Sequence, residues 1–396
     1  MVSRGPVVRV GFALGSWQVV ALAAGLAEAD ARAAPGRACE DHLVLYETVA
    51  VSDALKAAMR EVGAAVRPWR SIVDAFDLLA SVRRRIGQRE LEALIGRLRR
   101  HLGLARIDEL WLCWLTRPPE KLVAEAWPEA RIHFFEDGLF SYLPQRPTPV
   151  EPPPASLPWP SRWLARLRDG FDARRPVRRF RRYRSWLDPR HAGRVDAAWM
   201  LLADLWPPPA ELAAVPWHTV APERLRATLA ACCNLADVAG FHPEPLQRPA
   251  FLVLGQTLSR WGVLTRAEEL AVYAGAIATA IERGYDVWWK EHPRAQESFF
   301  ADLAAAAPLG RLRELALPFA LPVELVAERL QLAGCTAGVS TAIFYLPRLY
   351  GIAAFTFADA LAPFMKDRWA LQNELVRRSA TALSELPFAA TPPSPP

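Results

Sequence analysis

One stretch, Arg131-Ile132-His133-Phe134-Phe135-Glu136-Asp137-Gly138, joins a candidate strand to two carboxylates and a glycine. The aromatic and β-branched residues predict that the strand is buried. Open α/β sheets bind ligands at the carboxyl ends of their strands, so Glu136 and Asp137 are candidates for chemistry there. One carboxylate of such a pair can serve as a general base while the other holds the loop, and Gly138 permits the turn. Alone, these residues also fit an ordinary strand that ends in an Asp-Gly turn.

Strand-like and helical segments alternate on both sides of this stretch, which predicts an α/β fold with two doubly wound domains. In the first half we expect strands at 7–14, 42–46, 109–115 and 131–135, with helices near 17–28, 52–62, 72–102 and 119–126. In the second half we expect strands at 251–254, 285–290, 311–317, 335–339 and 352–357, and helices at 266–283 and from Glu324 to 332. The expected domains are 1–145 and 250–361, joined by a Pro/Arg-rich linker with a basic helical insertion at 146–249. A C-terminal helix at 362–379, expected to cross back to the first domain, and a disordered tail make up 362–396.

Composition narrows the class of protein. With 52% hydrophobic and 23% charged residues the chain is globular, and its net charge of +6 favours an anionic partner. Five scattered cysteines without a CxxC pair fit neither a disulfide framework nor a zinc site, so a cytoplasmic location is expected. The apolar run 7–26 could be a signal peptide, but we favour a strand, a Gly-Ser turn and a helix.

A basic and aromatic segment, Arg162–Arg194, follows the proline-rich residues 144–160. We expect it to bind the inner face of the plasma membrane or an anionic glycan or glycolipid acceptor. A solvated helical hairpin is the alternative. Nucleic acid is not expected, because no recognised binding module surrounds the segment.

Four strand–loop junctions in the second half add polar groups at the same sheet edge. His292 precedes Pro293 and can act as an acid near neutral pH, and Ser340 with Thr341 begins a helix whose free N–H groups suit phosphate. Glu324 suits ribose hydroxyls, and Gly255-Gln256 permits close approach of a nucleotide or sugar. Each feature alone is more typical of ordinary structure. The absence of G-x-x-x-x-G-K-[ST] and G-x-G-x-x-G motifs disfavours ATP hydrolysis and dinucleotide redox chemistry.

Taken together, the motifs resemble those of bacterial sialyltransferases, most of all the alpha-2,8-polysialyltransferase family. The resemblance is carried by Ser16-Trp17-Gln18, Glu136-Asp137-Gly138, Leu254-Gly255-Gln256, Lys290-Glu291-His292-Pro293, Pro322-x-Glu324 and Ser340-Thr341. It implies a GT-B fold, in which two Rossmann-like domains face each other across a cleft. It also implies CMP-sialic acid as the donor substrate, inversion at the anomeric carbon, and no metal or other cofactor. Ser-Thr replaces the paired serines common in the family.

The resemblance also assigns roles to residues. Glu136 is expected to be the general base, with Asp137 supporting the loop or the acceptor, and His292 is expected to protonate the departing CMP from the opposite side of the cleft. Ser340 and Thr341 would bind the phosphate and Glu324 the ribose. The remaining expected donor-binding residues are Gly255, Gln256, Lys290 and Pro293, and the expected acceptor-binding residues are Ser16, Gln18 and Gly138.

The implied activity is transfer of sialic acid to a glycan hydroxyl during synthesis of capsule or lipooligosaccharide. Two alternatives stay open at this point: a capsule transferase that uses CMP-Kdo, and a non-catalytic glycan- or membrane-binding relative. A binder needs neither an acid nor a base, which argues against the second alternative. Acceptor, linkage, oligomeric state and the choice between polymerisation and single transfer do not follow from the sequence.

Overall fold

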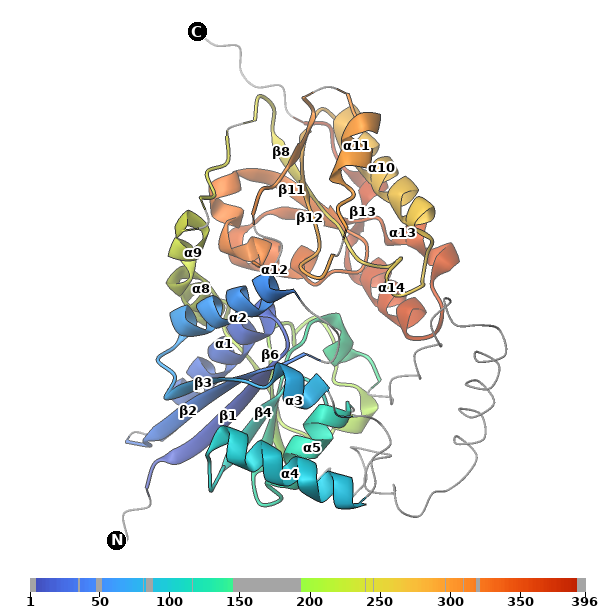
Figure 1. The fold of residues 1–396 in the computed structure, drawn as a ribbon. Helices are drawn as coiled ribbons and strands as arrows, with labels where there is room; N and C mark the ends of the chain where they lie inside the picture. The colour runs from blue at the N-terminus through green and yellow to red at the C-terminus, as the bar shows by residue number, and fades with distance from the viewer. Residues whose placement is uncertain are drawn as a thin grey trace, which may run out of the picture.

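The computed structural model describes residues 5–34, 36–47, 52–80, 82, 88–115, 117–144, 194–238, 240–244, 246–295, 297–308, 310–317 and 321–389. These residues form two α/β domains, which lie one above the other in Figure 1. Each domain contains a parallel sheet covered by helices. The carboxyl ends of the central strands of each sheet lie toward the other domain.

The first domain contains a seven-stranded parallel sheet of order β3-β2-β1-β4-β5-β6-β7. Its strands are β1 (Val7–Ala13), β2 (Cys39–Leu45), β3 (Ser71–Asp74), β4 (Glu109–Leu112), β5 (Arg131–Phe135), β6 (Val195–Met200) and β7 (Trp217–Thr219). The helices are α1 (Ser16–Arg32), α2 (Asp53–Val66), α3 (Phe76–Ala80), α4 (Gln88–Leu102), α5 (Pro118–Ala126), α8 (Pro222–Ala231) and α9 (Cys233–Val238), with short 3-10 turns η1 (Leu139–Tyr142) and η3 (Ala210–Leu212).

The second domain contains a six-stranded parallel sheet of order β10-β9-β8-β11-β12-β13. Its strands are β8 (Ala250–Leu254), β9 (Asp286–Lys290), β10 (Leu312–Glu314), β11 (Leu332–Ala337), β12 (Ala353–Thr356) and β13 (Thr381–Ala382). The helices are α10 (Arg266–Glu282), α11 (Phe300–Ala306), α12 (Ala342–Tyr350), α13 (Ala358–Leu361) and α14 (Asp367–Ser379), and the 3-10 turns are η4 (Val323–Leu325), η5 (Ala327–Leu330), η6 (Ala362–Phe364) and η7 (Leu383–Glu385).

Both sheets therefore have the strand order of a Rossmann fold, which reverses direction once, between β1 and β4 and between β8 and β11. The predicted GT-B arrangement of two such domains is confirmed. A ligand crevice opens at each reversal point, because the neighbouring connections leave toward opposite faces of the sheet. Residues that follow β1 and β4 and residues that follow β8 and β11 line one cavity between the domains.

The expected domain boundaries at 145 and 361 are wrong. β6 and β7 lie inside the segment 146–249 that we expected to be linker, but β6 pairs in parallel with β5, and β7 extends the same sheet. β13 likewise lies beyond 361 and completes the second sheet. β6 lies beyond the proline-rich residues that we expected to separate the domains, and β7 and β13 have only 3 and 2 residues, too few for a recognisable strand pattern.

Local predictions had mixed outcomes. Residues 7–28 form the expected strand, turn and helix, and β5 has the expected bounds. The expected helix at 72–102 is wrong at its start, where Ser71–Asp74 forms edge strand β3 beside β2. Two 3-10 turns replace the helix expected after Glu324. Within the described residues no helix is long and apolar enough to cross a membrane.

Helix α14 contacts both domains, as expected for the C-terminal helix. Trp369 packs edge-on against Phe140 of the first domain, with ring centroids 5.6 Å apart. At the other end of the helix, Ser379 accepts a hydrogen bond of 2.8 Å from the Trp206 indole. A salt bridge of 2.6 Å between Arg348 and Asp204 also joins the domains, so polar and aromatic contacts hold them together.

Candidate active site

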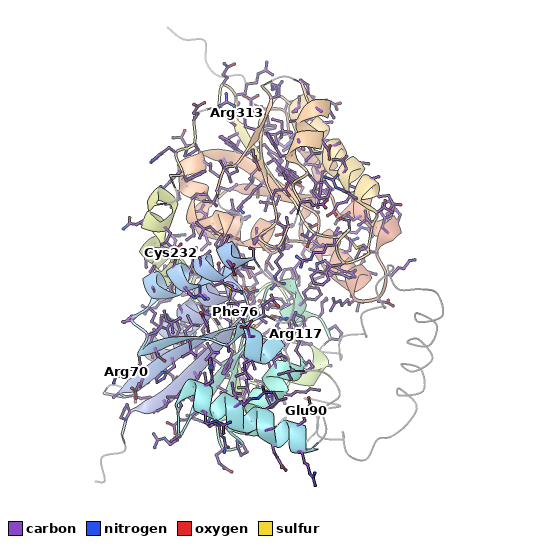
Figure 2. All side chains as sticks on the ribbon, viewed as in Figure 1. Arg70, Phe76, Glu90, Arg117, Cys232 and Arg313 are labelled. Atoms are coloured by element: carbon purple, nitrogen blue, oxygen red, sulfur yellow. The ribbon has the colours of Figure 1, made fainter. Side chains whose placement is uncertain are left out.

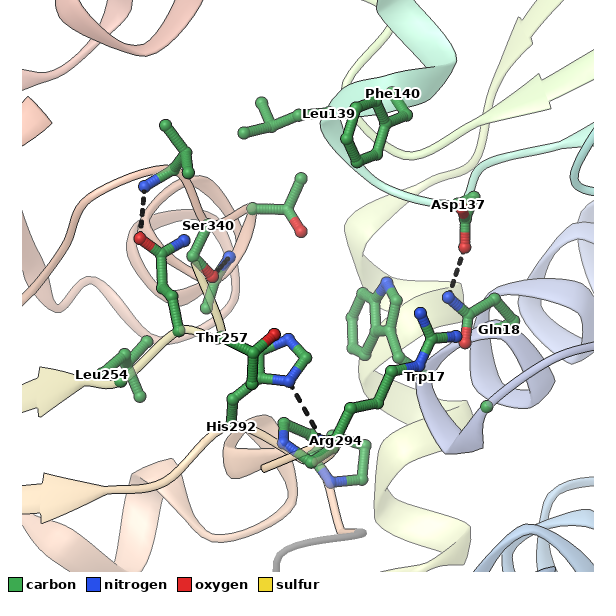
Figure 3. A pocket seen from close by; sticks show the side chains of 18 of the residues that line it. Trp17, Gln18, Asp137, Leu139, Phe140, Leu254, Thr257, His292, Arg294 and Ser340 are labelled. Carbon is green, nitrogen blue, oxygen red and sulfur yellow. Dashed lines mark hydrogen bonds between the residues drawn. The ribbon is translucent and has the colours of Figure 1, made fainter. Parts of the chain in front are cut away.

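A cavity of about 620 Å³ occupies the cleft between the domains. One wall comes from the loops after β1, β4 and β5, and the other from the loops after β8, β9 and β11 (Figure 3). Nearly all residues singled out in the sequence line it: Ser16, Gln18, Asp137, Gly255, Gln256, Lys290, His292, Pro293, Glu324, Ser340 and Thr341. Glu136 and Gly138 do not.

Asp137 is the carboxylate that the first domain presents to the cavity. Its two oxygens accept hydrogen bonds from the Gln18 amide and the Trp114 indole, and its backbone N–H donates to the Ser141 hydroxyl at 2.8 Å. Burial raises the pKa of Asp137, while the positive charges of Arg117 and Arg294 act in the opposite direction. These contacts hold a carboxylate at the cavity wall, which suits a general base.

Glu136 points away from the cavity, so the expectation that it faces His292 across the cleft is wrong. Its side chain is completely buried. One oxygen accepts a hydrogen bond from the Tyr345 hydroxyl. The other accepts from the Tyr142 hydroxyl and from the backbone N–H groups of Leu201 and Leu202, at 2.7 and 3.2 Å. Tyr345 belongs to α12 of the second domain, so Glu136 joins the two domains.

The protonation of Glu136 is set by this environment. Burial raises its pKa to about 7, and the four hydrogen bonds oppose that rise because they favour the ionised form. Because this side chain is completely buried and does not line the cavity, a substrate hydroxyl in the cavity does not reach it. The geometry thus supports a structural role for Glu136 and leaves Asp137 as the carboxylate that faces the cavity.

Gly138 is required by the backbone and by close packing. Its φ of 97° lies in the region that favours glycine. A Cβ at this position would lie 3.1 Å from the Thr341 hydroxyl of the second domain. The glycine therefore lets the loop after β5 approach the start of α12. It packs against the second domain and does not line the cavity.

The second domain presents the amino end of α12 to the cavity. Ser340 and Thr341 immediately precede this helix, and the Ser340 hydroxyl accepts a weak hydrogen bond of 3.3 Å from the Ala342 N–H. Gln256 fixes the loop, because its side-chain oxygen accepts from the Val339 N–H at 3.0 Å. The first-turn N–H groups and the helix dipole favour an anion at this end.

His292 follows β9 and lies beside this helix end (Figure 3). Its Nδ1 accepts a hydrogen bond of 3.0 Å from the Arg294 N–H, so in the neutral ring the proton sits on Nε2. Burial and the charges of Arg294, Lys290 and Arg260 lower the His292 pKa to about 3. The imidazole is thus a neutral hydrogen-bond donor, where the sequence suggested a cationic acid.

Lys290 and Glu324 are buried groups of opposite charge on the same wall. Burial lowers the pKa of Lys290 to about 8 and raises that of Glu324 to about 7, and each charge partly offsets the burial of the other. The Lys290 ammonium also donates to the Glu291 carbonyl at 3.3 Å. An ammonium and a carboxylate here can contact a phosphate and a pair of hydroxyl groups, respectively.

Gly255 lines the cavity and is also needed for packing, while its expected contact with the donor stays a prediction. A Cβ there would lie 2.8 Å from the Trp289 ring and 3.3 Å from the Lys290 carbonyl. The Gly255 N–H donates to that carbonyl at 2.9 Å. The glycine therefore seats the β8 loop against β9.

The structure adds charged and aromatic residues that the sequence analysis missed. They are Trp17, Glu47, Trp114, Arg117, Phe140, Arg294, Arg368 and Trp369. Arg294 crosses the cleft to an ion pair of 2.6 Å with Glu47, and Arg368 lies over the Phe140 ring at 5.2 Å. Arg294 directly follows His292-Pro293, and Arg117 follows the strand predicted at 109–115, so position after a strand was the available signal.

Two other expectations concern features outside the cavity. Residues 162–193 of the basic segment lie outside the described residues. Arg194 is described, and its guanidinium donates to the carbonyls of Ala124, Trp127 and Ala130 instead of joining a basic surface. Among the described residues, no group of three or more His, Cys, Asp or Glu side chains is arranged to hold a metal ion. The five cysteines are free.

Two Rossmann-like domains that present a carboxylate and an anion-binding helix end to one cleft define a glycosyltransferase of the kind that uses nucleotide-activated sugars. The model of the alpha-2,8-polysialyltransferase family matches residues 95–359. The chain belongs to this family and is a sialyltransferase by class. No curated protein matches it.

Solved structures share the architecture. A Photobacterium 2,6-sialyltransferase in a ternary complex with CMP and lactose is 11% identical, with 97% of this chain and 79% of that chain covered and a TM-score of 0.46. A sialyltransferase from Photobacterium damsela is 13% identical, with 98% and 82% covered and a TM-score of 0.46. The UDP-GlcNAc 2-epimerase from Methanocaldococcus jannaschii is 12% identical, with 89% and 84% covered and a TM-score of 0.49. At this level of similarity they say nothing about substrate.

Proposed function

We propose that this protein transfers sialic acid from CMP-sialic acid to a glycan hydroxyl, in the synthesis of capsule polysaccharide or lipooligosaccharide. One observation carries the proposal: Asp137 and the phosphate-suited group of His292, Ser340 and Thr341 line opposite walls of the same cavity. A displacement reaction needs a base on the acceptor side and stabilisation of the leaving group on the other side.

The second domain binds the donor. Ser340, Thr341 and the α12 N-terminus contact the CMP phosphate, and the Nε2–H of His292 donates to it. Lys290 lies on the same wall and adds a positive charge. Glu324, when ionised, accepts hydrogen bonds from the ribose hydroxyls. This arrangement supplies cationic and N–H donors for the charge that develops on the phosphate, so the proposed reaction proceeds without a metal or other cofactor.

The first domain binds the acceptor and removes its proton. The acceptor oxygen attacks the anomeric carbon, Asp137 takes the hydroxyl proton, and the bond from that carbon to the CMP phosphate breaks as CMP leaves. A single displacement of this kind inverts the anomeric carbon. Gln18 and Trp114 hold Asp137 in place, and the buried Ser16 hydroxyl, which has no partner among the described residues, is available to the acceptor.

An anionic glycan or glycolipid is the proposed acceptor, and the segment 162–193 is proposed to hold the protein at the inner membrane surface. The charge of that segment supports the membrane proposal. Replacing Arg178, Arg179, Arg181 and Arg182 by serine should weaken binding to anionic liposomes, and the difference should shrink as salt rises. Equal binding of the unaltered protein and the serine variant to anionic liposomes at low salt would contradict the proposed membrane role.

The activity itself is tested with purified full-length protein, CMP-sialic acid or CMP-Kdo, and a panel of glycan acceptors. CMP release and mass spectrometry of the products measure transfer. Transfer of sialic acid supports the proposal. Transfer of Kdo alone would mean that CMP-Kdo, and not CMP-sialic acid, is the donor substrate. Binding of acceptors with no transfer from either donor would point to the non-catalytic alternative.

A further inference from the structure

Arg117 differs from the other cations that line the cavity. Among the described residues its guanidinium has no ion pair and no hydrogen bond, and its one recorded contact is with the Trp114 ring, 3.9 Å from the centroid. In contrast, Arg294 is paired with Glu47, and the Lys290 ammonium donates to the Glu291 carbonyl. Figure 2 shows Arg117 on the side of the first domain that faces the second.

The surrounding contacts hold this guanidinium beside the proposed base. Trp114 stacks on Arg117 and also donates its indole N–H to Asp137, so one side chain positions both groups. The nearby Glu47 is ion-paired with Arg294, and Glu120 accepts from the Tyr46 hydroxyl with one oxygen while its other oxygen has no hydrogen-bond partner among the described residues.

The charge of Arg117 is retained despite its environment. Burial lowers the Arg117 pKa, but the negative charges of Glu120, Asp137 and Glu47 raise it by more. The N–H groups of this guanidinium still have no hydrogen-bond acceptor among the described residues, so an anionic ligand can accept from them. The five N–H groups of a guanidinium match a carboxylate in a bidentate contact better than a single ammonium does.

We propose that Arg117 binds the carboxylate of an acidic sugar in this cavity. Arg117 comes from the same wall as Asp137, whereas the groups suited to phosphate come from the opposite wall. The acceptor is therefore the first source of the carboxylate, and the donor, whose carboxylate is attached to the reacting carbon, is the second. The inference rests on the proposed function for its substrates.

The test uses the full-length protein and the variants Arg117→Met and Arg117→Lys, with Arg97→Met as the control. Arg97 is exposed on α4, so its replacement removes the same charge away from the cleft. Three acceptors are compared: a neutral galactoside, the same galactoside ending in sialic acid, and the C1 carboxamide of that sialic acid. Melting temperature and affinity for CMP, which has no carboxylate, show whether the variants are folded.

For Arg117→Met, KM for the acidic acceptor should rise about 10- to 100-fold, as expected for loss of a charged hydrogen-bonded contact. KM for the neutral and carboxamide acceptors should change by less than about threefold, and Arg117→Lys should recover part of the loss. A rise of the same size in KM for CMP-sialic acid with every acceptor would instead assign the carboxylate to the donor. The inference is overturned if Arg117→Met raises neither the acceptor KM nor the donor KM. It is also overturned if KM rises equally for the acidic and the carboxamide acceptors while the donor KM is unchanged.

Failure of the proposed function has a different signature. If the unaltered protein transfers neither sialic acid nor Kdo, Arg117 is tested by equilibrium binding of sialic acid and of its C1 carboxamide. Weaker binding of the acid, but not of the amide, to Arg117→Met supports the carboxylate site. Equal binding of the acid to both proteins rejects it.

Discussion

Replacing the two adjacent carboxylates separately gives the sharpest test of the active site. We expect Asp137→Asn to reduce transfer by roughly 10²–10⁴, the usual scale for loss of a general base, or about 3–5 kcal/mol in the barrier. Asparagine can accept from the Trp114 indole with its oxygen and donate to a reoriented Gln18 amide, so the two contacts of Asp137 can be kept. CMP affinity should stay within about threefold, because the proposed nucleotide contacts lie in the other domain.

Glu136→Gln should behave differently. The glutamine oxygen can accept from the Leu201 and Leu202 N–H groups and the Tyr142 hydroxyl, while its amide donates to the Tyr345 oxygen. The four contacts are kept in number, but charged hydrogen bonds become neutral ones at a cost of about 1 kcal/mol each. Part of this cost is offset because a buried ionised carboxylate is also removed. Turnover should therefore stay within about tenfold of the unaltered protein, or about 1.4 kcal/mol.

The assay measures CMP release and product formation under saturating donor, with CMP affinity by calorimetry and thermal unfolding as controls. The reasoning fails if Glu136→Gln loses transfer as severely as Asp137→Asn while its melting temperature and CMP affinity are unchanged. That result would mean that Glu136 becomes exposed in an opened form of the cleft and acts there as the base. Normal turnover by Asp137→Asn would also reject the assignment.

Three further predictions follow from the cleft and the domain contacts. His292→Gln should retain more transfer than His292→Ala, by about tenfold, because a glutamine amide can replace the Nε2–H as a neutral donor; equal loss in both would indicate that a proton is transferred. Glu136 has a pKa raised from 4.5 to about 7, so its contribution to folding stability is fully present below about pH 4.5 and is lost as pH rises through about 7. Chemical denaturation should show the unaltered protein losing roughly 3 kcal/mol relative to Glu136→Gln across that window, and parallel curves would contradict the burial argument. Removal of divalent metals with a chelator should leave transfer within about twofold if protein groups alone stabilise the leaving phosphate, whereas loss that added Mg²⁺ restores would assign this role to a metal.

The sequence predicted the residues at the strand ends well, but it did not predict all of the strands in each sheet. Motifs after consecutive strands converge in one cleft because parallel strands share a carboxyl edge, so most of the expected residues line the cavity. Strand β6 was missed because it lies beyond the proline-rich residues and pairs across them with β5, and β13 was missed because a strand of 2 residues has no recognisable pattern. Arg117 was missed because an arginine on a loop is typical of a solvated surface, and only packing on Trp114 brings it into the cleft.

The choice between Glu136 and Asp137 shows why a strand end alone does not identify a base. Side chains alternate between the faces of a strand, so two adjacent residues at its end point in opposite directions. Where one face meets water, the alternation of polar and apolar residues reveals which direction is which. The residues Ile132–Phe135 of β5 are all buried, so their sequence has no such alternation. It therefore does not indicate to which face of the sheet Glu136 or Asp137 points. The direction of Glu136 is instead fixed by Tyr345 and by the loop after β6, neither of which is near it in the chain. Assigning the base therefore required the contacts between domains, which exist only in the folded protein.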